Sequence, residues 1–368
     1  MTLRPIALFV FALFAALPAP AGEEISRTTD YHRLMTDSKL LYTILTADTV
    51  TKPVRGFSCP SRLAQQRVVV TAEGKQLVNW EPKPEAKPHF EAAEEHFQAK
   101  GMKEAGAAYA AGLAIDPDYG PGWLFGGDVP FHAGLYTEAL ESFRRALALD
   151  PTMPQGHRFA GDALVQLGRY PEALEEYILA LSYDPSYTNV LAALETLGKR
   201  AGFTVERPPA FEPPKDFLGQ LAGGEVEISV GQGSPWRPYT FCKAVWRYED
   251  KFRAQKLGQE NGAEYDWTFT EERECVASHY ASLYTVAEGK LRESKKIGSK
   301  RAKIGEAEIL AAGPPLLRHL HAVIEAQLLD GFVLFAILGR QCGMSVSLVP
   351  DEMRHALEQY IRRFVVKS

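Results

Sequence analysis

A motif that ends in Asp-Pro recurs in the middle of this chain with a period of 34 residues. The Asp-Pro pairs begin at Asp116, Asp150 and Asp184. Residues 134–151 and 168–185 are identical at ten of eighteen positions. A period of this length predicts a stack of similar helical units, because each unit can bury its apolar face only against a neighbour.

Fixed positions within the repeat predict that each unit is an antiparallel pair of helices. Small residues lie 24 and 12 positions before each proline, and an aromatic residue lies eight positions before it. Small side chains let two helices approach closely, the aromatic ring fills the space beside the next pair, and proline ends the second helix. The small residues are Ala93, Gly127, Gly161, Ala105, Ala139 and Ala173, and the aromatic residues are Tyr109, Phe143 and Tyr177.

This pattern resembles the tetratricopeptide repeat (TPR), in three units at residues 86–119, 120–153 and 154–187. The resemblance implies a mainly α fold, an α-hairpin solenoid, which the helix predicted at 188–202 would cap. The first unit departs from the pattern, because its turn glycine, Gly101, is one residue out of register. Pro130 lies inside the first helix of the second unit and predicts that this helix is kinked or short.

The resemblance also implies that the first helix of each unit lines a concave groove that binds a protein or peptide. The facing residues mix aromatic rings with acids, and Arg158 is their one cation, which argues against clamping of a peptide's terminal carboxylate. The predicted groove residues are Phe90, Glu94, Phe97, Leu124, Asp128, Phe131, Arg158, Asp162 and Val165.

The charge of the repeats indicates the kind of partner. Residues 86–187 contain seven Lys or Arg and fifteen Asp or Glu, a net charge of −8. We therefore expect a neutral or basic protein partner and no nucleic acid. Two alternatives remain open: the acids are a generally solvated surface, or the repeats are a packing scaffold without a ligand.

The first 21 residues predict a signal peptide, because Arg4 precedes an apolar run and small residues follow at Ala19 and Ala21. We therefore expect a periplasmic or extracellular protein. No apolar run in the mature chain is long enough for a transmembrane helix. In an oxidising compartment the four cysteines can form two disulfides, or they are buried free thiols. Their spacing does not indicate which cysteines pair. The cysteines are Cys59, Cys242, Cys275 and Cys342.

Composition divides the mature chain further. We predict an N-terminal segment at 22–85, the capped repeat stack at 86–202, a Pro-rich linker at 203–216 and a helical C-terminal domain of unknown type at 217–368. In the N-terminal segment we expect a helix over 29–49 and two short strands over 66–80. In the C-terminal domain we expect one strand, a loop at 231–239 and five helices. That strand is at 225–230, and those helices are near 240–257, 270–290, 303–329, 330–339 and 350–366.

A basic segment at 289–303 has a net charge of +6 and is predicted to be a loop. It suits an anionic lipid or polysaccharide of the cell envelope, it docks on the acidic repeats of the same chain, or it is simply solvated. Its cations are Lys290, Arg292, Lys295, Lys296, Lys300, Arg301 and Lys303.

No nucleophile, phosphate-binding or metal-binding motif occurs, so we expect an exported, non-enzymatic interaction protein with no catalytic residue, cofactor or metal. The alternatives are an adaptor that uses the basic segment and an enzyme or metal-binding protein with its site in the C-terminal domain. For a catalytic or metal site, His279, His321 and Glu325 are the first candidates. The partner, the pathway and the oligomeric state stay open.

Overall fold

The computed structural model describes residues 30–45, 65–72, 74–214, 216–220, 224–262, 264–296, 303–339 and 346–367, so the predicted signal peptide lies outside the described residues. The chain divides into two compact units, and each contains separate pieces of sequence. Unit 1 is Met1–Ser58 with Pro208–Val333, and unit 2 is Cys59–Arg207 with Leu334–Ser368. These units differ from the predicted boundaries, because the C-terminal helix packs on the repeats and the first described strand pairs within unit 1.

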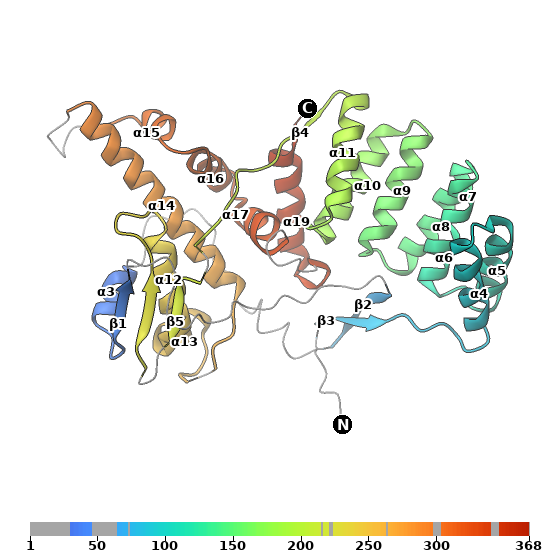
Figure 1. Cartoon of the computed structure of the whole chain (residues 1–368), viewed down its shortest axis with the longest axis horizontal. Coiled ribbons are helices and arrows are strands. Elements are labelled where there is room, and N and C mark those ends of the chain that lie inside the picture. Colours follow the sequence, from blue (N-terminus) through green and yellow to red (C-terminus); the bar gives the residue numbers. More distant parts are fainter. Residues whose placement is uncertain are drawn as a thin grey trace. The chain divides into compact units, whose positions relative to one another are not determined.

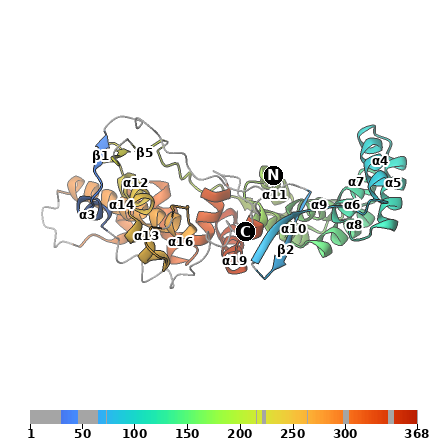
Figure 2. The same ribbon diagram turned by 90° about the horizontal axis from the view of Figure 1, so that it is seen from below.

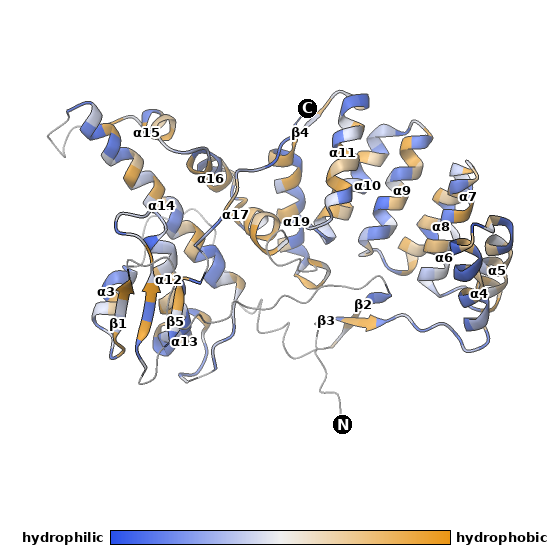
Figure 3. Cartoon of the chain, in the orientation of Figure 1, coloured by the Kyte–Doolittle hydropathy of each residue, from blue (hydrophilic) through white to orange (hydrophobic). Residues whose placement is uncertain are grey.

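Unit 2 contains the three predicted helix pairs and the capping helix, one after another along the stack (Figures 1 and 2). Figure 3 shows hydrophobic and hydrophilic residues alternating along these helices, as amphipathic helices require. The kinked or short helix predicted from Pro130 is confirmed, since the first helix of the second pair is divided at Gly127 into α6 and α7. The helices are α4 (Lys87–Gln98), α5 (Met102–Ile115), α6 (Gly120–Gly126), α7 (Asp128–His132), α8 (Tyr136–Leu149), α9 (Pro154–Gln166), α10 (Tyr170–Tyr183) and α11 (Thr188–Ala201).

The small residues of the repeat allow the close contacts predicted for them. A Cβ atom on Gly127 would lie 2.6 Å from Cε1 of Phe143, and one on Gly161 would lie 2.6 Å from Cε1 of Tyr177. These distances are shorter than van der Waals contact, so the aromatic ring of each pair can pack only against a glycine backbone.

The aspartate of each Asp-Pro pair accepts hydrogen bonds at the end of its helix pair. Asp150 Oδ1 accepts hydrogen bonds from the backbone and the hydroxyl of Thr152, and Asp184 Oδ1 accepts the same two bonds from Ser186. In the first unit, Asp116 Oδ2 instead accepts a bond of 2.8 Å from the backbone N–H of Lys83. The carboxylates of Asp150 and Asp184 thus stabilise the turn at which proline stops the second helix, whereas that of Asp116 ties the first unit to the segment before α4.

The two short strands predicted over 66–80 are confirmed as the antiparallel hairpin of β2 (Gln66–Thr71) and β3 (Gly74–Asn79) in unit 2. The C-terminal part of the chain completes this unit. Helix α19 and the π-helical turn η3 pack against α10, and strand β7 pairs antiparallel with β4. The bounds of these elements are η1 (Val333–Gly339), η2 (Val346–Leu348), α19 (Asp351–Tyr360), η3 (Ile361–Val365), β4 (Thr204–Val205) and β7 (Val366–Lys367).

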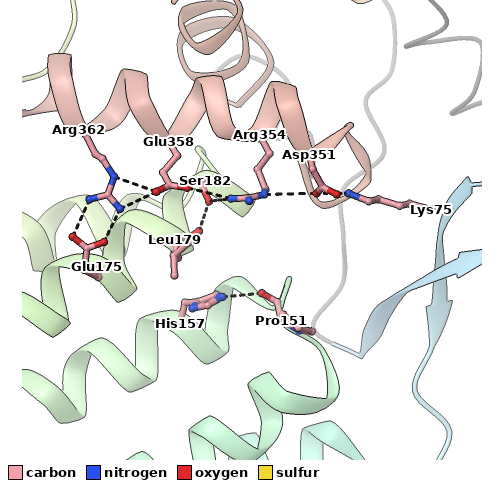
Figure 4. A network of polar contacts seen from close by, with 10 residues as sticks. All are labelled: Lys75, Pro151, His157, Glu175, Leu179, Ser182, Asp351, Arg354, Glu358 and Arg362. Carbon is pink, nitrogen blue, oxygen red and sulfur yellow. Dashed lines mark hydrogen bonds and ion pairs between the residues drawn. The ribbon is translucent and has the colours of Figure 1, made fainter.

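Polar contacts attach the C-terminal helix to the outer face of the third repeat (Figure 4). Arg362 donates two hydrogen bonds, of 2.9 and 2.6 Å, to the two carboxylate oxygens of Glu175 on α10. The guanidinium of Arg354 lies 5.0 Å above the ring of Tyr183. At the start of α19, Asp351 accepts a bond of 2.7 Å from Lys75 of the hairpin. The C-terminal helix is therefore a structural part of unit 2.

Unit 1 contains a three-stranded sheet in the order β1-β6-β5 and a set of helices. The helix predicted over 29–49 is wrong: it ends at Thr36, and β1 (Tyr42–Leu45) pairs in parallel with β6 (Val226–Ser229). The strand predicted at 225–230 is confirmed, and β5 (Leu218–Gln220) pairs antiparallel with it.

The helices predicted in unit 1 are present with different bounds, and the one predicted near 240–257 is divided at Glu249 into α12 and α13. Helix α12 already begins at Arg237, inside the predicted loop 231–239. The helix predicted over 303–329 is divided at Gly313 and Pro314, because proline cannot donate to the preceding turn. The helices are α3 (Tyr31–Thr36), α12 (Arg237–Tyr248), α13 (Asp250–Leu257), α14 (Phe269–Ser294), α15 (Glu306–Ala312), α16 (Pro315–Glu325) and α17 (Leu329–Phe332).

A disulfide between Cys242 and Cys275 joins α12 to α14, with 5.4 Å between the Cα atoms. Cys59 and Cys342 lie outside the described residues. In the part of the chain that the structure describes, no helix has both the length and the apolar character needed to cross a bilayer.

Candidate functional site

A pocket of about 250 Å³ opens between α7, α8 and α9 of unit 2. We call it the acid–aromatic pocket, because carboxylates and aromatic rings line it. Four of its residues were predicted as groove residues from their register in the repeat: Asp128, Phe131, Arg158 and Asp162. Its lining residues are Asp128, Phe131, His132, Phe143, Arg158, Phe159 and Asp162.

Asp162 is held in place by two neighbours. Its Oδ1 accepts a hydrogen bond of 2.6 Å from the hydroxyl of Tyr177, and its Oδ2 lies 3.1 Å from Nε of Arg158. Burial raises the pKa of the Asp162 carboxyl, while the Tyr177 hydroxyl and the Arg158 guanidinium counteract that shift. Much of the charge of this carboxylate is therefore already satisfied within the protein.

Asp128 has the equivalent position one repeat earlier but lacks these partners. Its register places it beside Phe143, which has no hydroxyl to donate. Among the described residues no hydrogen bond or ion pair reaches its carboxylate. Burial raises the pKa of Asp128 to about 7, opposed by Arg158 and assisted by the carboxylates of Glu94 and Asp162. A carboxyl in this environment favours either a proton or an incoming cation.

In the first repeat, the acid at the equivalent position already has a hydrogen-bond partner. Glu94 accepts a hydrogen bond from the hydroxyl of Tyr109, as Asp162 does from Tyr177. Phe97 lies on the surface of the stack, with its ring centroid 5.8 Å from that of His132 in the pocket. Val165 is half-buried on α9 and does not line the pocket. The three acids thus share a register, and only Asp128 keeps an unpaired carboxylate within the described residues.

Two predicted groove residues belong to the core instead. Phe90 is buried against the backbones of Gly112 and Gly122, which approach its ring too closely for a Cβ atom. Leu124 is fully buried. Both side chains are buried in the core of the stack, so they cannot contact a partner. Arg158 has the register of Phe90 and Leu124 in the third repeat. Its guanidinium stays at the pocket because Asp162 pairs with it.

Three pocket residues were not predicted as groove residues: His132, Phe143 and Phe159. Phe143 was interpreted only as a spacer between helix pairs. Comparison of Tyr109, Phe143 and Tyr177 would have drawn attention to it, since the middle repeat alone lacks the hydroxyl. His132 and Phe159 have no counterpart in the repeat pattern that would indicate their exposure.

The basic segment does not form the predicted continuous loop. Helix α14 runs through Ser294, so Lys290 and Arg292 lie on a helix. Arg292 pairs with Glu288, and Lys295 pairs with Glu308. Lys296 and Lys303 are exposed. Lys300 and Arg301 lie outside the described residues.

The candidates for a catalytic or metal site do not come together. His279 stacks on Trp236, with 3.7 Å between the ring centroids, and its Nδ1 bonds to the carbonyl of Pro235. His321 bonds to the hydroxyl of Tyr280, and Glu325 is exposed. Within the described ranges, no group of three His, Cys, Asp or Glu residues could hold a metal ion.

Unit 1 also buries a charged network beside its disulfide. Lys243 pairs with Glu271 and with Glu272, the latter at 3.0 Å. Tyr265 donates to Glu271, and Tyr239 donates to Glu272 at 2.7 Å. Burial raises the pKa of Glu271. Every carboxylate here already has a donor, so the network joins α12 to α14 and offers no free group to a substrate.

Comparison with known proteins agrees with the repeat geometry. The tetratricopeptide repeat family model matches residues 131–197, so this part of the chain is a TPR segment, and the C-terminal region is unassigned. No curated protein matches the chain.

Similar solved structures include three TPR proteins. The first TPR of Spaghetti (RPAP3) bound to the HSP90 peptide SRMEEVD is 20% identical, covering 32% of this chain and 93% of that one, with a TM-score of 0.31. The Yersinia enterocolitica type III secretion chaperone SycD, in complex with a peptide of the translocator YopD, is 21% identical over 31% and 93%, with a TM-score of 0.30. The Sgt2 TPR domain from Aspergillus fumigatus is 20% identical over 39% and 93%, with a TM-score of 0.31.

Proposed function

We propose that this protein is an exported TPR protein that binds a protein or peptide partner in the cell envelope and performs no chemistry. The acid–aromatic pocket is its binding site. The partner inserts one Lys or Arg side chain into it. The observation that carries the proposal is the carboxylate of Asp128, which is half-buried and unpaired within the described chain.

The chemistry of the pocket favours a cation over other groups. Asp128 and Asp162 provide two carboxylates, while Arg158 provides one positive charge that is directed at Asp162. An inserted ammonium or guanidinium group would neutralise Asp128, whose ionised form is disfavoured by burial. The half-buried ring of Phe131 adds a face for cation–π contact, whereas the ring of Phe159 already lies 5.1 Å from the guanidinium of Arg158.

The volume of the pocket indicates a side chain rather than a whole small molecule. Sites for small ligands usually enclose ~300–1,000 Å³, which is larger than this pocket. A single Lys or Arg side chain suits a volume of about 250 Å³. The rest of the partner would then lie along the first helices, where Phe97 and His132 continue the surface.

The packing of unit 2 supports this choice of face. Helix α19 and η3 contact α10, the second helix of the third pair. Asp150, in the turn after α8, contacts the backbone N–H of Val68 in the hairpin. These elements contact α10 and the turn after α8, whereas the pocket is lined mainly by the first helices α7 and α9, with Phe143 of α8.

Two observations support export. The first 21 residues have the pattern of a signal peptide. The disulfide between Cys242 and Cys275 suits an oxidising compartment such as the periplasm or the cell exterior.

The test is binding of a defined peptide pair to the full mature chain. One peptide contains a central lysine, and its twin contains norleucine there, which keeps the length and removes the charge. We expect calorimetry to detect the lysine peptide only, and we expect Asp128→Asn to weaken its binding by at least about tenfold. Glu138→Gln is the matched control, because it removes one negative charge from an exposed site on α8.

The natural partner is then sought by cross-linking in envelope extracts with the same variants. Capture that Asp128→Asn and Glu138→Gln leave equally strong would refute the assignment of the pocket. Equal binding of the lysine and norleucine peptides would refute the cationic partner while leaving a TPR interaction intact.

A further inference from the structure

A cleft of about 740 Å³ lies in unit 1, lined by residues of that unit alone. One face of α14 forms its floor, through residues spaced three or four apart. The first turns of α3 and α12 form its walls, with Gly233 and Ser234 between them. Its volume is in the range of sites for small organic molecules.

Arg237 is the feature of this cleft that needs an explanation. It is the first residue of α12, and its Nε atom is buried without a hydrogen-bond partner. Among the described residues no carboxylate pairs with its guanidinium, which lies 5.3 Å above the ring of Phe241. A partly buried cation without an anion is costly, so the cleft favours a ligand that carries a negative charge.

A second group in the cleft has free hydrogen-bonding capacity. Ser278 and Thr285 on α14 donate their hydroxyl hydrogens to the helix backbone. Ser282, between them on the same face, makes no hydrogen bond through its side chain within the described part of the chain. Its hydroxyl can therefore donate to an anion that Arg237 also contacts.

The other charged groups do not cancel this preference. Asp30 is exposed and accepts a hydrogen bond from the backbone N–H of Arg33, so it caps α3. His32 is exposed on the wall beside Phe241. The N-terminus of α12 has no side-chain cap, and its partial positive charge adds to that of Arg237.

The rest of the lining is apolar. Phe241, Pro238, Ala281 and Val286 present hydrocarbon surface. A fully polar anion such as phosphate would leave this surface wet, whereas an organic anion with an apolar body would cover it.

We propose that the cleft between α3, α12 and α14 is a binding site for a small organic acid with an apolar body. The carboxylate of the ligand pairs with Arg237 and accepts a hydrogen bond from Ser282. Its hydrocarbon part lies on Phe241, Ala281 and Val286. This site is independent of the acid–aromatic pocket, so either assignment can fail without the other.

The test uses three probes with the same ten-carbon chain: decanoate, decanol and decyltrimethylammonium, all below their micellar concentrations. Binding to the full mature chain is measured by calorimetry. We expect decanoate to bind and the cation to bind at least about tenfold more weakly, because only the anion satisfies Arg237. We expect decanol to bind with intermediate affinity.

Variants locate the bound probe. Arg237→Gln should weaken decanoate binding by at least about tenfold and leave decanol binding unchanged. Arg237→Lys should restore part of the loss. Ala281→Phe should fill the cleft and weaken both probes. The control is Arg33→Gln, which removes a positive charge from an exposed side chain that pairs with Asp37 outside the cleft.

Three results would overturn the proposal: no decanoate binding to the wild-type chain, decanoate binding that survives Arg237→Gln, or equal binding of decanoate and decyltrimethylammonium. Circular dichroism melts of each variant show that it is folded. If Arg237→Gln fails to fold, the comparison of Ala281→Phe with the wild type, together with the charge preference among the three probes, decides the matter.

Discussion

The hydroxyl of Tyr177 lies 2.6 Å from Oδ1 of Asp162 and donates a hydrogen bond to it. One repeat earlier the same two positions hold Phe143 and Asp128, and no hydroxyl is available. The missing hydroxyl, together with Leu124 at the position that Arg158 holds one repeat later, thus leaves one carboxylate satisfied and the other open to a partner.

The open carboxylate is expected to reduce stability above neutral pH. The pKa of Asp128 is raised to about 7, so the folded chain retains a proton that the unfolded chain has already lost between pH 4 and 7. Stability from this group is therefore present at low pH and is lost as the pH rises through 7. Asp128→Asn should raise the free energy of unfolding at pH 8 by about 1 kcal/mol or more and change little at pH 4. Urea denaturation at both pH values measures this, and an equal effect at both would contradict it.

Binding of a cationic peptide should show the opposite dependence. The ionised fraction of Asp128 rises from about a tenth at pH 6 to about nine tenths at pH 8, given a pKa of about 7. We expect the affinity for the lysine peptide to increase by up to roughly tenfold over that range, and to become flat in Asp128→Asn. Phe143→Tyr, which supplies the missing hydroxyl, should move the midpoint to lower pH. Calorimetric titrations at several pH values follow both effects.

Glycine is required where the aromatic ring of a repeat meets the neighbouring helix. Gly161→Ala would place a Cβ atom 2.6 Å from the ring of Tyr177, so it should destabilise unit 2 by about 1–3 kcal/mol. Gly289→Ala is the control for adding a methyl group to a helix, because nothing lies within 4 Å of the new atom. It should stabilise α14 by up to about 1 kcal/mol. Thermal melts that rank the two variants in the reverse order would disprove this account.

The contact between Arg362 and Glu175 should couple the C-terminal helix to the third repeat. Hydrogen bonding to Arg362 lowers the pKa of Glu175, so this contribution is present above the unfolded pKa and is lost as the pH falls. The two side chains are 30% and 53% exposed, so solvent screens the pair. A double-mutant cycle with Arg362→Gln and Glu175→Gln should give a coupling energy of about 0.5–1 kcal/mol. A coupling of zero at low salt would show that this ion pair does not stabilise the packing of η3 and α19 on α10.

Unit 1 should lose stability in mild acid. Burial against Trp236 lowers the pKa of His279 to about 4, below its unfolded value of 6.5. The unfolded chain takes up a proton first, so stability is fully present above pH 6.5 and falls as the pH drops toward 4, by roughly 3 kcal/mol. His279→Phe keeps a ring beside Trp236 and should abolish this part of the acid dependence. Tryptophan fluorescence during denaturation at pH 7 and pH 4.5 reports it; an unchanged acid dependence in the variant would assign the loss to other groups.

The sequence predicted best what depends on neighbours along the chain. The 34-residue register located the helix pairs, the break at Pro130 and four of the pocket residues, because each unit repeats the same local packing. It misplaced Phe90 and Leu124, since register does not distinguish the face toward the second helix from the face toward solvent. For the same reason Phe143 was not predicted as a pocket residue, although it both packs between helices and lines the pocket.

Contacts between distant segments could not be predicted in this way. The helical spacing near residue 44 was overridden when Tyr42–Leu45 paired with Val226–Ser229, because strand pairing depends on a partner elsewhere in the chain. The amphipathic pattern of residues 350–366 predicted a helix correctly and gave no sign that the helix packs on α10. Its position follows from a surface that a single sequence does not reveal.

The parallel pairing of β1 with β6 has a consequence for the order of folding. Thr43 meets Glu227, its partner in the sheet, only after the whole repeat segment between them has left the ribosome. The repeats rely on short-range contacts and can form as they emerge, whereas closing a loop of this length is an entropically costly and slow step. We therefore expect two refolding phases. The solenoid forms in the fast phase, and β1 pairs with β6 of unit 1 in the slow phase.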